Sequence, residues 1–377
     1  MSVARVRMRT LAAGACLALA AVACGSGVPK PTATPRHPTG VDATPSATPD
    51  ASNVYGAIGP NNMSAAVQGI TPRVYVPNTN SNTVDVIDPS TYQVVDQFDT
   101  GKLPEHITPS WDMKHLYVDN DIGNTLTELD PATGKPVRTI VVDDPYNLYF
   151  TPDGSRAIVV AERQRRIDFY DPHTWTKVGS YTILHSGPNH LDFTADGKYL
   201  LISCEFSGYV VKVDVQNMKG VVALYVGGKP TDVRLSPDGK VFYVANEHRN
   251  GVSVVDPVAM KEVKFIPTAP GTHGFVVSRD GKSLYVTNRL AGSVSVLDFA
   301  TQQITATWDT GGSPDMGGVT ADGRELWLSG RYNAVVYVID TFTGRVTHRI
   351  PVGSGPHGIC VFPQPGRYSL GHTGNYR

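Results

Sequence analysis

The sequence predicts an all-β fold, a seven-bladed β-propeller with four strands in each blade. The main observation is a turn motif that recurs every 42 or 43 residues, counted from glycine to glycine. The motif is Asp-Gly in five copies, at 153–154, 196–197, 238–239, 280–281 and 322–323. A degenerate copy at Asp112-Met113 precedes them and a Pro-Gly copy at Pro365-Gly366 follows, so the region contains seven repeats.

Each repeat contains the same four segments in the same order. In one repeat the turn at 280–281 is followed by segments at 284–288 and 294–298, and then by a fourth segment that leads to Gly311-Gly312. These segments are short, rich in β-branched or aromatic residues and bounded by turn residues, as is typical of strands. No window of helical periodicity competes with them. A period near 42 residues with four strands is what one propeller blade requires.

The ends of the repeat region predict how the propeller closes. The region begins at 73–76 with a second-strand sequence and finishes at 357–361 with a first-strand sequence. We therefore expect strands from the N- and C-terminal ends to share one blade, which removes the two edges that an open array would expose. The tail from Tyr368 to Arg377 lies beyond the last strand needed, and its Gly-His-Thr-Gly segment at 371–374 could fold back over a face.

The N-terminal region predicts export and a lipid anchor. Residues 1–23 combine a basic start with an apolar stretch and small residues, the layout of a signal peptide. The segment before Cys24 resembles a bacterial lipobox, which implies cleavage and lipidation at Cys24. A Pro/Thr/Ala-rich linker follows over 24–61, and we assign 62–377 to the propeller. We expect the protein on the outer face of the bacterial cytoplasmic membrane, attached by lipid alone; plain secretion with an incidental cysteine is the alternative.

Composition excludes several classes of protein. The chain has 377 residues, 41% hydrophobic and 18% charged, which excludes a disordered or fibrous protein. Its formal net charge is -1, and removing the three arginines of the signal segment leaves 30 basic against 34 acidic residues. A nucleic-acid surface would have to be local, such as the cluster at Arg163, Arg165 and Arg166, and we expect no nucleic-acid partner. We expect no disulfide between Cys204 and Cys360, which fall on non-adjacent repeats.

A four-residue motif carries a family resemblance. It reads Tyr-Val-Thr-Asn at 285–288, with variants at 75–78, 117–120 and 243–246. On these residues, the region from Arg73 to Gly366 resembles the YVTN-repeat, YncE-like family of bacterial seven-bladed propellers. The resemblance implies the fold and leaves the function open, because such propellers include binding proteins, lyases and metal or haem oxidoreductases.

Four of the eleven histidines occur at the same place in their repeats, at the start of the first strand: His106, His190, His273 and His357. In a propeller of this strand order, that loop opens onto one face around the central channel, where a binding pocket is expected. Neutral imidazoles there could bind copper, zinc or iron, or hold a haem or an acidic ligand. Alternatively, they cap strand ends through hydrogen bonds to the backbone. His273 and His357 come one residue earlier than the other two, so not all four need face the channel.

An outer shell of the same pocket is predicted on the loops one residue past each motif asparagine position. Those loops carry glutamates on three consecutive repeats and arginines on two others, and we add one first-strand aspartate: Glu162, Glu205, Glu247, Arg289, Arg331 and Asp232. The arginines could clamp a carboxylate or phosphate, and the glutamates could bind a cation or act as a base. The alternative is that they are ordinary solvated loop charges.

These features favour a monomeric propeller that binds a small-molecule or protein ligand at a polar central pocket. Catalysis is not implied, and no catalytic residue is assigned. The first alternative is a metal- or haem-dependent oxidoreductase, with copper favoured, which a resemblance to haem-carrying nitrite reductase and His-rich nitrous oxide reductase propellers keeps open. A metal-assisted lyase or lactonase is the second. A plain interaction scaffold would instead show an exposed apolar patch on one face.

Overall fold

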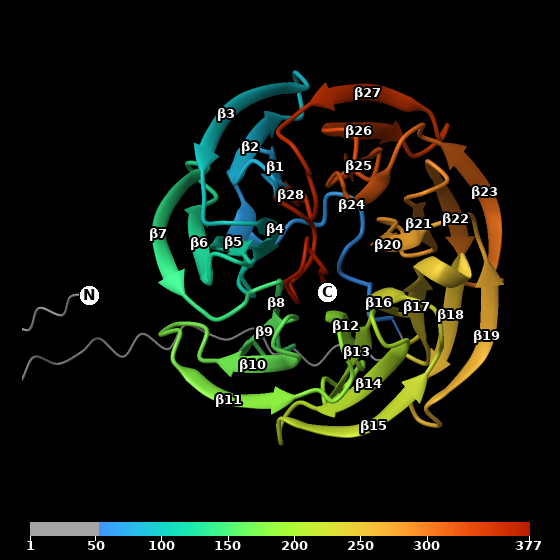
Figure 1. The fold of residues 1–377 in the computed structure, drawn as a ribbon. Coiled ribbons are helices and arrows are strands. Elements are labelled where there is room, and N and C mark those ends of the chain that lie inside the picture. Colours follow the sequence, from blue (N-terminus) through green and yellow to red (C-terminus); the bar gives the residue numbers. More distant parts are fainter. Residues whose placement is uncertain (1–52) are drawn as a thin grey trace, which may run out of the picture. The chain divides into compact units, whose positions relative to one another are not determined.

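The computed structural model describes residues 53–377, which form seven four-stranded antiparallel sheets arranged as a ring of blades (Figure 1). This confirms the predicted all-β propeller and its strand count. The predicted signal peptide, the lipidated Cys24 and the linker up to residue 52 lie outside the described residues. Within residues 53–377, no helix is long and apolar enough to cross a membrane.

Six blades are built from four consecutive strands each, and we number the blades in chain order. Blades 1 to 3 contain β4 (Pro104–Pro109), β5 (Leu116–Asn120), β6 (Thr125–Asp130), β7 (Lys135–Val141); β8 (Asn147–Phe150), β9 (Ala157–Ala161), β10 (Arg166–Tyr170), β11 (Lys177–Thr182); and β12 (Pro188–Phe193), β13 (Tyr199–Cys204), β14 (Tyr209–Asp214), β15 (Lys219–Tyr225).

Blades 4 to 6 follow the same plan. They contain β16 (Pro230–Leu235), β17 (Phe242–Asn246), β18 (Gly251–Asp256), β19 (Lys261–Pro267); β20 (Thr272–Val277), β21 (Ser283–Asn288), β22 (Ser293–Asp298), β23 (Gln303–Asp309); and β24 (Pro314–Val319), β25 (Glu325–Gly330), β26 (Val335–Asp340), β27 (Val346–Pro351). Two short 3-10 helices, η1 (Ala65–Val67) and η2 (Glu247–Arg249), lie in connecting segments.

Blade 7 joins the two ends of the chain. Its innermost strand is β28 (Cys360–Phe362), followed outward by β1 (Arg73–Asn78), β2 (Thr83–Asp88) and β3 (Gln93–Asp99). β28 and β1 pair antiparallel, with Val74 opposite Val361 and Tyr75 opposite Cys360. The predicted closure by terminal strands is therefore confirmed, and Cys204 and Cys360 are both buried free thiols.

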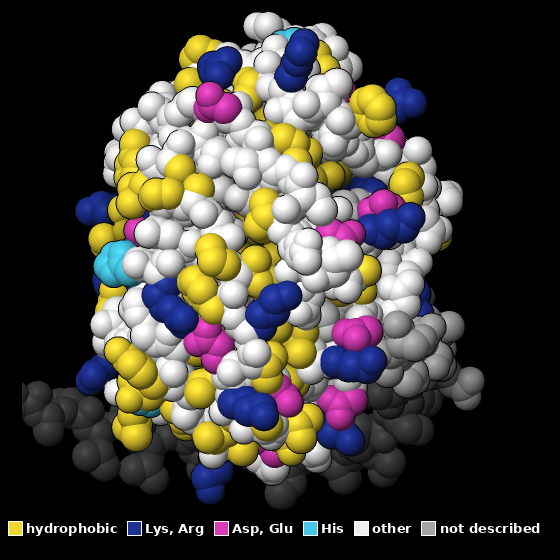
Figure 2. Space-filling view, turned by 90° about the vertical axis from the view of Figure 1, so that its right-hand side faces the viewer, with side chains coloured by type: hydrophobic (Ala, Val, Ile, Leu, Met, Phe, Trp, Pro, Cys, Tyr) yellow, Lys and Arg dark blue, Asp and Glu magenta, His cyan; other side chains and the backbone are white. Residues whose placement is uncertain are grey.

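Burial changes from the channel to the rim in the way that stacked blades require. Inner strands such as β12 and β16 are buried at every position, because other blades cover both faces. The outermost strand β23 instead alternates exposed and half-buried residues along its length. On the side of the propeller in Figure 2, charged side chains of both signs are interspersed among apolar ones.

The innermost strands share an irregularity that positions the candidate site. In blades 1, 3, 4, 5 and 6 the pairing between the first two strands shifts register near the start of the first strand, for example between Pro104 and Ile107 and between Pro188 and Leu191. Such a β-bulge places two residues opposite one and interrupts the strict alternation of side chains. In blades 1, 3 and 5 the two bulge residues are the pair that contains His106, His190 or His273, whereas His357 lies just before β28.

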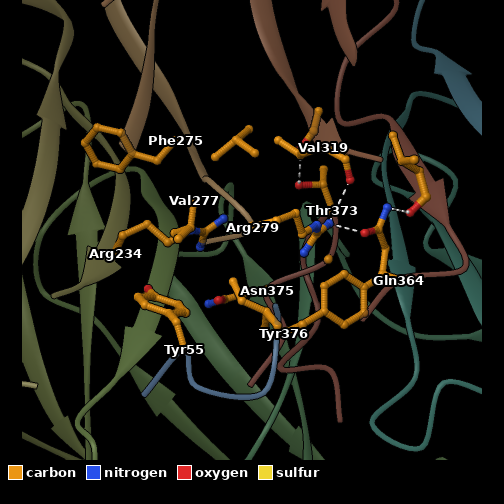
Figure 3. A pocket seen from close by; sticks show the side chains of 16 residues that line it. Tyr55, Arg234, Phe275, Val277, Arg279, Val319, Gln364, Thr373, Asn375 and Tyr376 are labelled. Atoms are coloured by element: carbon orange, nitrogen blue, oxygen red, sulfur yellow. Dashed lines mark hydrogen bonds between the residues drawn. The ribbon is translucent and has the colours of Figure 1, made fainter. Parts of the chain in front are cut away.

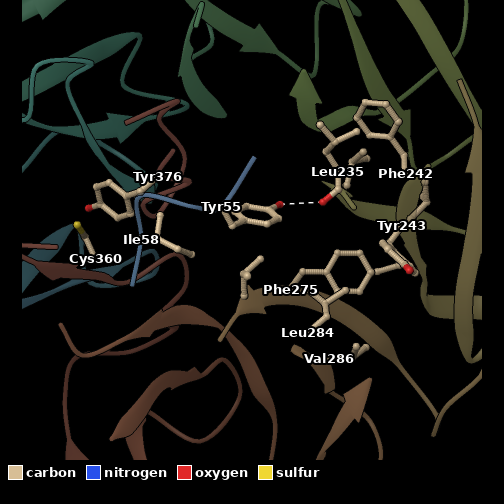
Figure 4. Packing of buried hydrophobic residues seen from close by; sticks show 14 of the residues in the cluster. Tyr55, Ile58, Leu235, Phe242, Tyr243, Phe275, Leu284, Val286, Cys360 and Tyr376 are labelled. Atoms are coloured by element: carbon tan, nitrogen blue, oxygen red, sulfur yellow. Dashed lines mark hydrogen bonds between the residues drawn. The ribbon is translucent and has the colours of Figure 1, made fainter. Parts of the chain in front are cut away.

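Two terminal segments pack inside the propeller. At the N-terminal end, Tyr55 donates from its hydroxyl to the carbonyl of Leu235 at 2.8 Å and joins a core cluster with Ile58, Phe242 and Phe275 (Figure 4). Residues 53–61 are therefore partly buried in this core, although we assigned them to the linker from the sequence. At the other end, residues 367–377 form a hairpin at the centre of the ring (Figure 1).

The two terminal segments meet around a cavity of about 30 Å³, room for about two water molecules. Tyr55 lies on one side of it and Asn375 and Tyr376 of the C-terminal hairpin on another (Figure 3). Arg279 borders the cavity and donates to the carbonyl oxygen of Val319 at 2.7 Å. The centre of the propeller is thus filled by polypeptide at this level.

Candidate functional site

All four predicted histidines lie buried in the central channel. Their exposed fractions range from 0% for His106 and His190 to 3% for His273 and His357. The imidazole centroid of His106 is 4.7 Å from that of His357 and 5.3 Å from that of His190, and His273 lies 6.3 Å from His357. The bulges in blades 1, 3 and 5 explain why His106 and His190 in one register and His273 in the other reach the same channel, where regular alternation would have pointed some of them away.

A fifth histidine, His372, comes from the C-terminal hairpin and completes a cluster with His106 and His190. Its imidazole centroid is 5.1 Å from that of His106 and 4.7 Å from that of His190. One ligand atom from each of the three lies within 4.8 Å of the others, as is also true of His273, Asp315 and His357. The channel thus holds two adjacent groups that we call the histidine triad (His106, His190, His372) and the carboxylate triad (His273, Asp315, His357).

Hydrogen bonds fix the orientation of the histidine triad. His106 donates from Nδ1 to the carbonyl oxygen of Tyr146 at 2.9 Å, which leaves a lone pair on Nε2. That Nε2 lies 3.4 Å from Nε2 of His190, while Nδ1 of His190 has no hydrogen-bond partner. Asn147 donates from Nδ2 to Nδ1 of His372 at 3.1 Å. With this tautomer of His106 the two Nε2 atoms form a hydrogen bond in which His190 donates, and Nδ1 of His190 is left without a partner.

The carboxylate triad belongs to a chain of buried charges. Arg289 donates from Nη2 to Oδ1 of Asp315 at 2.7 Å, and Nδ1 of His273 lies 2.8 Å from the same oxygen. Nε2 of His357 lies 3.5 Å from Oδ2 of Asp315. The imidazole contacts are at ion-pair distance but are not aligned hydrogen bonds, because Nδ1 of His273 and Oδ2 of Asp315 lack a hydrogen-bond partner.

The same chain continues from His357 to blades 1 and 6. Nδ1 of His357 lies 2.6 Å from Oε2 of Glu105, and Arg331 donates from Nη1 to that oxygen at 3.3 Å. Ionisable groups therefore follow one another from Arg289 through Asp315, His357 and Glu105 to Arg331, and each carboxylate has an arginine beside it. This arrangement compensates each buried charge by its neighbours.

Burial sets the protonation states of the channel. Desolvation lowers the pKa of His106 to about 3 and that of His273 to about 4, and it lowers the pKa of His190 and His372 well below the usual range. Burial alone would raise the pKa of Glu105, but His357 and Arg331 outweigh it and lower that pKa to about 2. Neutral imidazoles beside ionised carboxylates are the forms in which these groups bind metal ions.

The predicted outer shell separates into two parts. Glu205 and Glu247 lie on either side of the Lys229 ammonium, at 3.8 and 3.3 Å, and Asn189 donates from Nδ2 to Glu162 at 3.3 Å. Arg289 mainly contacts Asp315 of the carboxylate triad, and its Nη1 lies 4.0 Å from Oε2 of Glu247.

The remaining two members of the predicted outer shell lie elsewhere. Arg331 donates to Glu105 and to Thr79 of the N-terminal half of blade 7. Asp232 does not join the glutamates: its fully buried carboxylate accepts backbone N–H groups of Val233 and Phe275 at 2.8 Å, and so links blades 4 and 5.

A scan against protein-family models decides the family. Residues 52–367 match the model described as YNCE-like beta-propeller. The chain belongs to this YNCE-like family. No curated protein matches it.

Solved structures similar to this YNCE-like chain share its fold at low identity. Hydrazine synthase from Kuenenia stuttgartiensis is 20% identical, with 68% of this chain and 88% of that chain covered and a TM-score of 0.60. Dihydro-haem d1 dehydrogenase NirN in complex with DHE is 16% identical, with 80% and 78% covered and a TM-score of 0.61. A functionally unknown protein from Desulfotomaculum acetoxidans is 18% identical, with 77% and 98% covered and a TM-score of 0.67. These similarities show the fold alone.

Sequence reasoning missed three residues that build the site of this YNCE-like propeller. Glu105 and Asp315 are the first bulge residues of blades 1 and 6, the position that His273 has in blade 5, so aligning the repeats by residue type would have found them. His372 lies outside the repeats, and only the glycines around it indicated a turn. Its role depends on a fold-back that no repeat pattern encodes.

The pKa of Glu162 predicts that the stability of this YNCE-like propeller depends on pH. Burial raises its pKa to about 8, and the nearby carboxylates of Glu205 and Asp121 add to the shift. Between about pH 4.5 and pH 8 the folded state holds a proton that the unfolded state releases, so the free energy of unfolding falls as pH rises through this window.

The Glu162→Gln variant should remove this loss of stability. We expect its thermal midpoint to match that of the unsubstituted protein near pH 4.5 and to exceed it by about 2 °C or more at pH 8. Thermal unfolding followed at several pH values measures the difference. A difference that stays constant across the window would contradict the prediction.

Proposed function

We propose that this protein binds a divalent transition metal ion in its central channel, with His106 and His190 as the first two ligands. Copper is the favoured ion and zinc the next, because imidazole nitrogen suits both and copper binds more tightly at a given nitrogen site. The proposal concerns binding and assigns no catalytic step.

The observation that carries the proposal is the 3.4 Å separation between Nε2 of His106 and Nε2 of His190. Two nitrogen ligands at 2.0–2.1 Å from one tetrahedral ion lie about 3.3–3.4 Å apart. The carbonyl of Tyr146 accepts from Nδ1 of His106, which leaves the His106 Nε2 lone pair available for a metal. Such a hydrogen bond from the far ring nitrogen is the usual support of a metal-binding histidine.

The three imidazoles of the histidine triad are neutral, so each can offer a lone pair to a metal ion. The carboxylates of Glu105 and Asp315 favour positive charge on His106, whereas His357 and, at His372, Arg234 oppose it. The carboxylate triad is the less suitable site because Arg289 already compensates Asp315, and a metal there would meet the guanidinium charge. The histidine triad has no such competing cation among its hydrogen-bond partners.

Metal binding is tested on the full-length protein, which is purified in detergent without chelators and titrated with Cu²⁺ and with Zn²⁺. We expect one ion per chain, and an affinity reduced at least about 100-fold in the His106→Ala variant. The His348→Ala variant is the matched control, because His348 lies on the outer strand β27. Unchanged binding in His106→Ala, or no binding by the unsubstituted protein, would overturn the proposal.

We further propose that the site acts outside the cytoplasm, on a propeller held at the membrane through Cys24. The basis is the signal-like segment and the cysteine that ends it, both in the sequence. Growth with labelled fatty acid tests this: label should enter the protein and should be absent from the Cys24→Ser variant. Equal labelling of both proteins would contradict the anchor.

A further inference from the structure

The C-terminal hairpin is built into the channel by backbone hydrogen bonds to two blades. Phe150 of blade 2 donates its N–H to the carbonyl of Leu370 at 2.9 Å, and His372 donates its N–H to the carbonyl of Leu148 at 2.7 Å. Ser369 donates its N–H to the carbonyl of Trp111 at 3.0 Å. The hairpin therefore extends blade 2 towards the channel axis, where the innermost strand β8 has no histidine.

The tip of the hairpin lies at the level of the histidine triad. Its turn spans residues 371–374, and both flanking glycines have positive φ, 92° at Gly371 and 116° at Gly374. A Cβ on Gly371 would approach the carbonyl oxygen of Leu148 to 2.5 Å, so only glycine allows this close approach to blade 2. The turn places the imidazole of His372 among those of His106 and His190, where it is 1% exposed.

We infer that His372 is the third protein ligand of the metal ion, so that the C-terminal hairpin and the ion hold each other in the channel. This inference rests on the proposed function and adds the ligand that no repeat of the propeller supplies. Three imidazoles with a fourth position open to solvent or a small ligand is a known arrangement for zinc, and imidazole equally suits copper.

Asn147 determines what must change when the ion binds. Its oxygen accepts the backbone N–H of Leu148 at 2.9 Å, so its Nδ2 faces Nδ1 of His372. With the amide in this orientation, the neutral imidazole of His372 carries its proton on Nε2. If Nε2 were to bind a metal ion, that proton would have to move to Nδ1 and the Asn147 amide would have to turn its oxygen towards it.

The hairpin also has an attachment that does not involve the metal. Arg377 donates from Nη2 to both carboxylate oxygens of Asp192 at 2.8 Å, and its guanidinium lies 4.6 Å from the ring centre of Tyr55. This contact holds the hairpin in the channel independently of any ion. By thermodynamic linkage, an ion bound through His372 must strengthen hairpin docking by the same factor by which docking strengthens ion binding.

The first test compares metal affinity in the full-length protein and in the His372→Gln variant, with Thr373→Ala as the matched control in the same turn. We expect the affinity for Cu²⁺ and Zn²⁺ to fall by about 10- to 100-fold in His372→Gln and to stay unchanged in Thr373→Ala. In the unsubstituted protein, Zn²⁺ should slow hydrogen exchange of the amides in residues 368–377. In His372→Gln it should not.

A second variant gives a positive signal that misfolding cannot mimic. In His372→Cys, a Co²⁺ ion bound at the triad should gain a thiolate-to-cobalt charge-transfer band in the near ultraviolet. The Thr373→Cys variant and the unsubstituted protein, whose Cys204 and Cys360 are buried in strands, should lack this band. The band arises only if the side chain at 372 touches the ion.

The outcomes separate this inference from the proposed function. If His106→Ala loses the metal while His372→Gln binds it normally and His372→Cys shows no band, His372 is not a ligand and the proposed function stands. If the unsubstituted protein binds no metal and Zn²⁺ leaves hairpin exchange unchanged, both are overturned.

Discussion

The Asp192→Ala variant is expected to lose about 3–5 kcal/mol of stability, because it leaves a buried guanidinium without its counter-charge. Arg377 is 3% exposed, and Asp192 is the acidic group that its Nη2 contacts. The same carboxylate accepts the backbone N–H groups of Phe193 and Leu235 at 2.8 Å. One substitution therefore removes an ion pair and two backbone acceptors from the interior.

Combining Asp192→Ala with Arg377→Met should recover part of this loss, because the uncompensated charge is then gone. The backbone N–H groups of Phe193 and Leu235 would still lack their acceptor, so the double variant should remain less stable than the unsubstituted protein. Thermal unfolding of Asp192→Ala, Arg377→Met and the double variant gives the interaction free energy between the two side chains. A double variant that is no more stable than Asp192→Ala would show that the guanidinium charge is not the cause.

The fold was predictable because the sequence pattern of one blade occurs seven times. The turn motifs and the four short strands recur in register, so errors in one repeat are corrected by the others, and the closing strand was identifiable as a misplaced first strand. The positions of His106, His190 and His273 on inner strands, and of His357 just before β28, followed from the same alignment. Local sequence was sufficient for these features, since each blade is mostly a consecutive set of hairpins.

The parts of the site that escaped prediction depend on contacts that the repeats do not contain. No residue pattern predicted the bulges that turn His106 and His273 into one channel, because regular alternation is the default for a strand. His372 reaches the triad through a hairpin that pairs with blade 2, about 220 residues away in the chain. Arg289 was expected beside glutamates, but the nearer and more buried Asp315 attracts it.

The Asp315→Asn variant has the second large expected effect, and it also decides which triad holds a metal. Asparagine keeps the size of the side chain but removes the charge that compensates Arg289, which is 8% exposed and whose next acidic contact, Glu247, is 4.0 Å away. We expect a loss of about 3 kcal/mol or more in the free energy of unfolding. Arg289→Gln in the same chain should restore part of it, since the unpaired charge is removed.

Metal binding by Asp315→Asn discriminates between the two triads. If the ion binds to His106, His190 and His372, the variant should unfold at lower temperature yet bind Cu²⁺ within a few-fold of the unsubstituted affinity, since Asp315 acts there only through its distant charge. If the ion binds to the carboxylate triad, the variant loses a ligand. Its metal affinity should then fall by about 100-fold or more, the reduction expected above for His106→Ala. The structure favours the first result, because Arg289 donates to Oδ1 of Asp315 and a metal ion at this carboxylate would lie beside the guanidinium charge.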